Sequence, residues 1–276
     1  MKIKNHRFEG VDFVESPNTS GPYKENNPDT IIIHYTAGSS AASSIRTLTD
    51  PNIKASAHLV VARDGTITQL VPFNIISWHA GKSSYEGRVG FNKYSIGIEI
   101  DNAGLLDKNG SVYTSWFGRV YPESEVFAGV HRNQSTVKHW HRYSEEQITV
   151  VDDMCRVLVK EYNMRQILGH EEISPGRKVD PGPAFPLDKL RDRIFRASRD
   201  QDEDEIAGFP VDGTVAASKL NIRAKPDRSG KKVADALVRG KKVKVLEQDD
   251  DWYRVSTEIE GWVAKKFVDL EDEVAL

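Results

Sequence analysis

The stretch TIIIHYT, residues 30–36, decides the fold that we predict for the first part of this chain. Its β-branched, nearly uninterrupted apolar side chains leave neither face polar, which is typical of a strand buried on both faces of a sheet. SIGIEI, residues 95–100, predicts a second buried strand. AHLVVARDGTITQLVP, residues 57–72, predicts a hairpin that turns at Asp64-Gly65.

An amphipathic helix is predicted at residues 144–162, where SEEQITVVDDMCRVLVKEY repeats apolar side chains at helical spacing. Ser144 and Gln147 fit a capping box at its start. Cys155, the one cysteine of the chain, lies among the apolar positions of this helix, so we interpret it as a buried packing residue rather than a nucleophile. Strands and amphipathic helices together predict an α/β fold with a mixed central β-sheet flanked by helices.

The composition indicates a globular protein and excludes some classes of function. Of the 276 residues, 38% are hydrophobic and 29% are charged, and the net charge is −3. No apolar run approaches the ~20 residues of a membrane helix, and MKIKNHRFEGVDF at the N-terminus has no apolar segment of the kind that a secretory signal needs. We therefore expect no membrane span, no nucleic-acid partner, and synthesis in the cytoplasm.

The charge run RDQDEDE at residues 199–205 predicts an exposed linker. We accordingly expect a first domain at 1–198, an acidic linker at 199–210 and a second domain at 211–276. The second domain consists of short alternating segments separated by turn residues, a pattern that predicts a small all-β barrel. Residues 105–143 show weak periodicity and several aromatic side chains, and we expect a functional or family-specific insertion there.

The segment ILGHEEISPGRKVDPGPAF, residues 167–185, is rich in Pro and Gly, so it predicts a loop rather than a long helix or a central strand. It contains His170, Lys178 and Asp180. Composition alone leaves two interpretations open: a surface loop with ordinary polar residues, or a loop that holds reactive groups in place.

Three residues of this chain have the identity and position of metal ligands. His34 lies at the end of a predicted buried strand and His170 at the end of another, and sheet proteins often place reactive groups on the loops at strand ends. Two imidazoles and the carboxylate of Asp180 make a typical catalytic zinc set, which leaves a fourth position for water. Zinc lowers the pKa of that water to about 7. A structural site would instead close all four positions, usually with cysteines.

Five motifs carry a resemblance to a known family: TIIIHYTAG, SAHLVVARDGTITQLV, WHAGKSSYEGR, NKYSIGIEI and GHEEISPGRKVDPGPAF. In this order they resemble the type 2 N-acetylmuramoyl-L-alanine amidases, a zinc family that includes the peptidoglycan-recognition proteins, over roughly residues 28–190. The resemblance implies hydrolysis of the amide bond between the lactyl group of N-acetylmuramic acid and L-alanine of the peptidoglycan stem peptide.

The resemblance also implies roles for single residues. His34, His170 and Asp180 would bind one Zn²⁺, Glu99 would activate the metal-bound water, and Lys178 would stabilise the oxyanion. The positions of substrate contacts in the cleft are matched by His58, Trp78 and His79.

Two departures from the phage-type members are informative. Ala57 occupies the position where those members carry a catalytic tyrosine, so Glu99 must serve as the base, as in the recycling-type branch. Asp180 occupies a position where phage-type members often have cysteine.

Other polar and aromatic candidates remain open. We expect His139 and His141 to be exposed to solvent, because no acidic residue lies near them at suggestive spacing. Aromatic residues of the first domain either line a sugar or peptide cleft or pack in the core: Trp78, Tyr85, Tyr113, Trp116 and Phe117.

The second domain resembles the bacterial SH3-like domain through LNIRAKP, RGKKVKVL, DDWYRV and GWVAKKFV. The resemblance implies a half-open barrel that binds cell-wall peptide, which would raise the local concentration of the enzyme at the wall. Trp252, Tyr253 and Trp262 are the expected wall contacts, although core packing is an equal alternative for each. A domain that only packs on the first domain or dimerises is the other interpretation.

The expected partner is peptidoglycan or its muropeptides, with no protein partner evident, and three functions remain to be distinguished. The first is a lytic zinc amidase, an endolysin or exported hydrolase, acting on the cell wall or in the periplasm. The second is a cytoplasmic amidase that recycles anhydro-muropeptides. The third is a non-catalytic peptidoglycan-binding protein. The wall-binding domain favours the first.

Overall fold

The computed structural model describes residues 1–24, 28–196, 210–227, 229–249 and 252–258. The chain divides into two compact units, Met1–Asp204 and Glu205–Leu276. Nearly all of the predicted linker lies outside the described residues, as does Trp262, so the predicted domain boundaries stay predictions. No helix in the described part of the chain is long and apolar enough to cross a membrane.

A six-stranded mixed sheet forms the centre of the first unit, in the order β17-β5-β11-β6-β7-β3. The middle strand β5 runs parallel to both of its neighbours, whereas β6 and β7 form the predicted antiparallel hairpin, with Gly65 at a φ of +83° in its turn. The mixed sheet of the predicted α/β fold is thus confirmed. Its strands are β3 (Asp12–Phe13), β5 (Thr30–Tyr35), β6 (Leu59–Val61), β7 (Ile67–Gln69), β11 (Ser95–Ile100) and β17 (Gln166–Gly169).

Side chains of β5 alternate between two buried faces, which explains why the strand is apolar throughout. Ile31 and Ile33 belong to the main core, which also includes apolar residues of helices α2 (Glu145–Tyr162) and α4 (Leu187–Arg196). The predicted capping box of α2 is present, and Cys155 is buried. His34 alternates with these isoleucines and therefore points away from the two helices.

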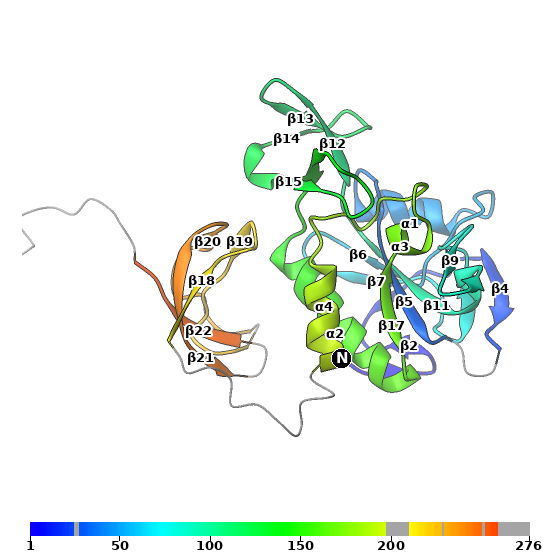
Figure 1. The fold of residues 1–276 in the computed structure, drawn as a ribbon. Coiled ribbons are helices and arrows are strands. Elements are labelled where there is room, and N and C mark those ends of the chain that lie inside the picture. The colour runs from blue at the N-terminus through cyan, green and yellow to red at the C-terminus, as the bar shows by residue number, and fades with distance from the viewer. Residues whose placement is uncertain (25–27, 197–209, 228, 250–251, 259–276) are drawn as a thin grey trace, which may run out of the picture. The chain divides into compact units, whose positions relative to one another are not determined.

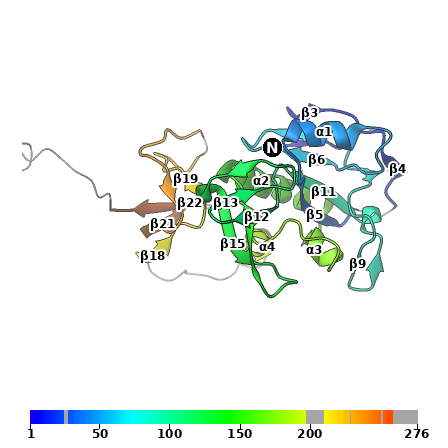
Figure 2. The ribbon, with the colours of Figure 1, turned by 90° about the horizontal axis from the view of Figure 1, so that it is seen from above.

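The opposite face of the sheet carries the polar site. Helix α1 (Ala41–Thr49) packs there against Val60 and Leu70, and the short helix α3 (His170–Ile173) begins where β17 ends. A view from above shows α1 and α3 at opposite margins of the unit, with β5 and β11 between them (Figure 2).

Residues 105–141 form a second, antiparallel sheet in the order β14-β13-β12-β16-β15, drawn in green at the top of Figure 1. Its small core includes Leu106, Tyr113 and Tyr121. His141 is only 6% exposed, which corrects the predicted solvent exposure. It faces Val126 across the β15–β16 pair, and the Ala103 N–H donates to its Nδ1 at 3.1 Å. The strands are β12 (Leu105–Asn109), β13 (Val112–Thr114), β14 (Val120–Tyr121), β15 (Val126–Val130) and β16 (Val137–His141).

Short elements complete the first unit at its margins. Three two-stranded sheets pair β1 with β2, β4 with β8, and β9 with β10. Two 3₁₀ turns precede β11 and β15. These elements are β1 (Ile3–Lys4), β2 (Arg7–Phe8), β4 (Thr19–Pro22), β8 (Ile75–Ser77), β9 (Ser84–Tyr85), β10 (Arg88–Val89), η1 (Phe91–Lys93) and η2 (Glu123–Glu125).

The described residues of the second unit form strands and no helix. Strand β21 pairs antiparallel with β18 and with β22, and β19 pairs with β20. This arrangement is consistent with the predicted small all-β domain. Tyr253 on β22 is 61% exposed, whereas Val215, Leu237 and Val245 are buried. The strands are β18 (Val211–Thr214), β19 (Lys219–Leu220), β20 (Leu237–Val238), β21 (Lys242–Asp249) and β22 (Trp252–Ser256).

Candidate metal centre

Three buried side chains from separate segments meet at the carboxyl end of the central strands. His34 lies on β5, His170 begins α3 directly after β17, and Asp180 lies on the loop before α4. Strand β17 pairs in parallel with β5, with Gly169 opposite Ile33. His34 and His170 each follow one of these paired residues, so they lie side by side at the ends of neighbouring strands. Parallel pairing thus brings these two predicted ligands together.

One atom of each side chain faces a common centre. His34 Nδ1 lies 2.9 Å from His170 Nδ1 and 3.0 Å from Asp180 Oδ2. His170 Nδ1 lies 2.9 Å from the same carboxylate oxygen. Tetrahedral zinc with bonds of roughly 2.0–2.1 Å holds its ligand atoms roughly 3.3 Å apart. The observed triangle therefore fits a zinc ion after a small outward adjustment of the side chains.

Hydrogen bonds behind the two imidazoles fix which nitrogen faces the centre. His79 Nε2 lies 3.1 Å from the Ser95 carbonyl, which can only accept, so this nitrogen carries the proton. His79 Nδ1 is then the acceptor for the Nε2–H of His34, at 2.9 Å. His170 Nε2 in turn donates to the Ala80 carbonyl at 3.2 Å. Both ligands thus present an unprotonated Nδ1, and such fixed tautomers are typical of metal-binding histidines.

The protonation states also suit a cation. Burial, followed by the proximity of His170, lowers the pKa of His34 to about 4, so this imidazole is neutral at pH 7. Burial alone would raise the pKa of Asp180, but the two histidines beside it hold the pKa of its carboxyl far below its usual range. Neutral imidazoles and an ionised carboxylate are the forms that bind metal.

Glu99 lies beside the ligands on the next strand, in register with His34 across the parallel β5–β11 pair. Its Oε2 is buried and has no hydrogen-bond partner among the described residues. Burial, then repulsion from Asp180, raises the pKa of Glu99 to about 8, whereas Lys178 lowers it. A buried carboxylate oxygen without a partner is costly. A cation with its bound water would supply the missing partner.

Lys178 is half-buried on the loop that carries Asp180. Its positive charge lowers the pKa of both His34 and Glu99. The structure therefore brings His34, His170, Asp180 and Glu99 together and places Lys178 on the loop that carries Asp180.

His79 takes a different position from the predicted substrate contact. It lies directly behind His34 and is only 8% exposed. A Cβ atom at position 97 would lie 2.4 Å from the His79 ring, so only glycine at this position of β11 lets the imidazole rest against the sheet. The glycine of SIGIEI thus makes room for the residue behind His34, a role that no pattern in the sequence indicates.

His58 is completely buried, which corrects its predicted contact with substrate. The Gly97 N–H donates to its Nδ1 at 3.0 Å, and its Nε2 donates to the Ile75 carbonyl at 2.9 Å. His58 therefore supports the strand under His79. Trp78, by contrast, is partly exposed, with its indole N–H bonded to Ser20 Oγ at 2.6 Å, and its substrate contact stays a prediction.

A buried ion cluster fixes the loop that carries the ligands. The Glu171 carboxylate accepts from His131 Nε2 at 2.6 Å, from Arg132 Nε at 2.8 Å and from the Gly182 N–H at 3.1 Å. The Glu171 N–H also donates to the Asp180 carbonyl at 2.8 Å. The second sheet, through its β15–β16 loop, therefore holds the ligand loop. The one sequence feature that could have indicated this cluster is the acidic residue Glu171 directly after the predicted ligand His170.

The central sheet and the buried ligand set define an α/β protein with a candidate catalytic metal centre. Residues 24–183, more than half of the chain, match the family model of N-acetylmuramoyl-L-alanine amidase, and the chain belongs to this family. Residues 218–269 match the bacterial SH3 domain.

Curated relatives carry related names. The 1,6-anhydro-N-acetylmuramyl-L-alanine amidase AmpD of Salmonella typhimurium is 30% identical over 149 residues, 53% of this chain and 61% of that protein. The N-acetylmuramoyl-L-alanine amidase AmiD of Escherichia coli K12 is 30% identical over 169 residues, 58% of this chain and 51% of that protein. This chain thus spans about three fifths or less of their lengths. A crystal structure of a selenomethionine AmpD derivative is 26% identical, with a TM-score of 0.50, and covers 69% of this chain and 98% of that one.

Proposed function

We propose that this protein is a zinc-dependent N-acetylmuramoyl-L-alanine amidase that acts on polymeric cell wall. The observation that carries the proposal is the triangle of His34, His170 and Asp180 ligand atoms, 2.9–3.0 Å apart, beside the unpartnered carboxylate oxygen of Glu99. When bound, zinc supplies an activated water and polarises the amide carbonyl.

The side chains around the ligands supply the remaining chemistry. Glu99 accepts a proton from the attacking water and passes it to the leaving amine of L-alanine, so the C–N bond breaks with a neutral amine leaving. Lys178 stabilises the negative charge that develops on the carbonyl oxygen. His79 keeps the His34 ring in the tautomer that presents Nδ1. The complete set of ligands, base and cation favours catalysis over the non-catalytic binding protein.

The bacterial SH3 domain favours intact wall as the substrate, because a second wall-binding site raises the local concentration of the enzyme on a polymer. A wall substrate would place the site of action in the wall or periplasm after release or export. The second candidate is a cytoplasmic amidase for soluble anhydro-muropeptides, which the name of the AmpD relative favours.

Both proposals are tested with the full chain on purified sacculi and on a soluble anhydro-muramyl-peptide. We expect one zinc ion per chain and release of stem peptides from sacculi. Asp180→Ala should lose the zinc and at least about 100-fold in rate, because a three-ligand site cannot hold the ion with two. Circular dichroism checks that the variant is folded. Hydrolysis of the soluble substrate alone would favour the cytoplasmic amidase over the wall amidase. Hydrolysis of neither substrate would favour a non-catalytic peptidoglycan-binding protein.

A further inference from the structure

An exposed indole ring is held in place at the tip of the β13–β14 hairpin. Trp116 is 73% exposed, yet its Nε1 donates to the Ala37 carbonyl at 2.7 Å. Phe117 packs edge-on against it, with the ring centroids 5.6 Å apart. The indole thus keeps a broad apolar surface in water while its polar edge is already bonded. A rigid aromatic ring with an exposed apolar face and a hydrogen-bonded polar edge is typical of binding surfaces.

The hairpin reaches the chain segment that leaves the metal centre. Ala37 follows the ligand His34 by only three residues, so their Cα atoms lie at most roughly 11 Å apart. The Ser115 N–H donates to the Arg119 carbonyl at 2.9 Å and closes the turn that carries Trp116. Trp116 therefore lies over the loop that extends from the carboxyl end of β5.

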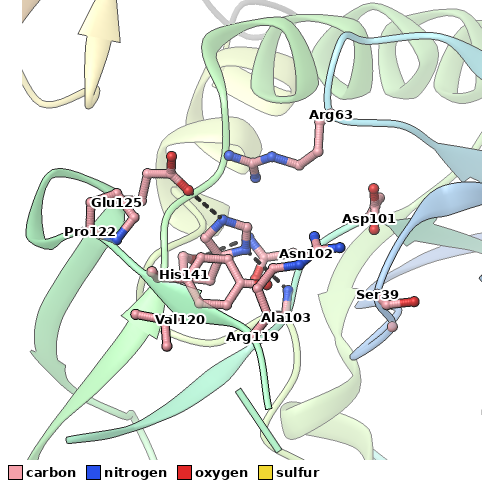
Figure 3. A pocket seen from close by; sticks show the side chains of 12 residues that line it. Ser39, Arg63, Asp101, Asn102, Ala103, Arg119, Val120, Pro122, Glu125 and His141 are labelled. Carbon is pink, nitrogen blue, oxygen red and sulfur yellow. Dashed lines mark hydrogen bonds and ion pairs between the residues drawn. The ribbon is translucent and has the colours of Figure 1, made fainter. Parts of the chain in front are cut away.

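A cavity of about 340 Å³ lies where the hairpin meets this loop (Figure 3). Its wall is formed by Gly38 and Ser39 after β5, by the loop after β11 that begins at Asp101, and by the segment from Arg119 to Glu125. Arg63 and His141 complete it. The two loops continue directly from the strands that carry His34 and Glu99, so the cavity and the metal centre share the same end of the sheet.

The side chains in the cavity are strongly polar but carry no net charge. The guanidinium groups of Arg63 and Arg119 balance the carboxylates of Asp101 and Glu125. His141 is neutral, because burial and then the two arginines lower its pKa to about 3. A ligand with free carboxylates, such as a stem peptide, would meet no excess of positive charge here. An uncharged ligand with many hydrogen-bonding groups fits better.

Donors for such a ligand are in place. Arg63 Nη1 is bonded to the Arg142 carbonyl at 2.7 Å and to Gln147 Oε1 at 2.8 Å, which fixes the guanidinium. Its Nε and Nη2 have no hydrogen-bond partner within the described parts of the chain, and Figure 3 shows the group pointing towards the cavity. Glu125, 3.5 Å from His141 Nε2 and half-exposed, supplies an acceptor.

We propose that the hairpin and this cavity form a subsite for an N-acetylhexosamine residue of the glycan strand, next to the muramyl residue whose amide lies at the metal. Trp116 stacks on the apolar face of the sugar ring, and Arg63 and Glu125 bond its hydroxyl and acetamido groups. That a muramyl residue lies at the metal rests on the proposed amidase function. The subsite adds a preference for substrates in which a second sugar is linked to that muramyl residue.

The first experiment compares two substrates, a soluble peptide carrying one muramyl sugar and a glycan-strand fragment of several disaccharides. We expect the ratio of kcat/KM for the long over the short substrate to fall about tenfold in Trp116→Ala and less in Trp116→Phe, which keeps an aromatic ring. The control Val112→Ala removes another exposed apolar side chain of the same hairpin, outside the cavity, and should keep the wild-type ratio. An equal loss on both substrates, or no loss on either, would overturn the subsite.

The second experiment needs no hydrolysis and therefore separates this proposal from the amidase function. The probe is tri-N-acetylchitotriose, titrated into the Asp180→Ala protein and followed by tryptophan fluorescence and calorimetry. We expect saturable binding that weakens about tenfold or more when Trp116→Ala is added. If chitotriose does not bind, or binds equally well without the indole, the subsite is wrong. If it binds but the full chain hydrolyses no muramyl-peptide, only the proposed amidase function fails.

Discussion

The buried carboxyl of Glu99 predicts a pH-dependent stability of the metal-free protein. Its pKa is raised to about 8, whereas an unfolded chain ionises near 4.5. Between these pH values the folded state binds the extra proton, so the free energy of unfolding falls as pH rises. A tenfold change in a proton equilibrium is worth about 1.4 kcal/mol. Because Glu99 as a residue is partly exposed, although its Oε2 is buried, we discount the full shift. We expect the free energy of unfolding of metal-free Glu99→Gln to exceed that of wild type by about 2 kcal/mol at pH 8.5 and to match it near pH 4.5.

Urea unfolding of chelator-treated protein at the two pH values measures this difference, in which all other titrating groups cancel. An equal pH dependence in both proteins would show that Glu99 is not held in a buried, proton-retaining state.

At the scale of single residues the sequence predicted much of the candidate site, because a titratable residue in an apolar strand such as TIIIHYT or SIGIEI is conspicuous. It did not predict the positions of His58 and His79, because their partners, among them the Gly97 N–H, the Ser95 carbonyl and the His34 ring, come from segments far apart in the sequence.

Among the elements, the second sheet is attached to the ligand loop through the ion pair of the partly exposed Arg132 with the buried Glu171. Removing Arg132 takes away a positive charge that compensates the Glu171 carboxylate, whose side chain is only 3% exposed. A buried carboxylate that loses a charged partner destabilises the fold. Because Glu171 also bonds the segment of Asp180, we expect Arg132→Ala to weaken zinc binding about 10–100-fold in competition with a chelator. Arg254→Ala breaks an exposed pair with Glu247 in the other unit and should leave zinc affinity unchanged.

If a folded Arg132→Ala protein binds zinc with wild-type affinity, the ion pair stabilises the fold but does not position the ligand loop.

The central strands and α2 were predictable because period-two and helical patterns are long and apolar there. The second sheet was not, since its strands are short, and the buried side chains that hold it, among them His131, Trp140 and His141, are polar or aromatic. Residues of that kind look like surface or loop positions until cross-strand partners are known.

For the whole molecule, sequence patterns revealed two kinds of domain because their periodicities differ, helical and period-two in the first part and short strands with turns in the second. They could not reveal which aromatic residues of the second unit reach solvent. The core of a small barrel and its binding surface draw on the same residue types. Tyr253 is 61% exposed on β22, whereas its neighbour Trp252 is partly buried.

Tyr253 is therefore the side chain with which we test wall binding by the second unit. Tyr253→Ala in the full chain should lower the amount of protein that sediments with sacculi about tenfold, which corresponds to ~1.4 kcal/mol and to one aromatic anchor. Tyr253→Phe, which keeps the ring, should retain most of the binding. The rate on sacculi should fall relative to the rate on a soluble muramyl-peptide, because only the polymer offers two sites to one molecule. Undiminished sedimentation of Tyr253→Ala would mean that this face of β22 does not touch the wall, and a loss of both rates in parallel would mean that the substitution acts on the catalytic unit instead.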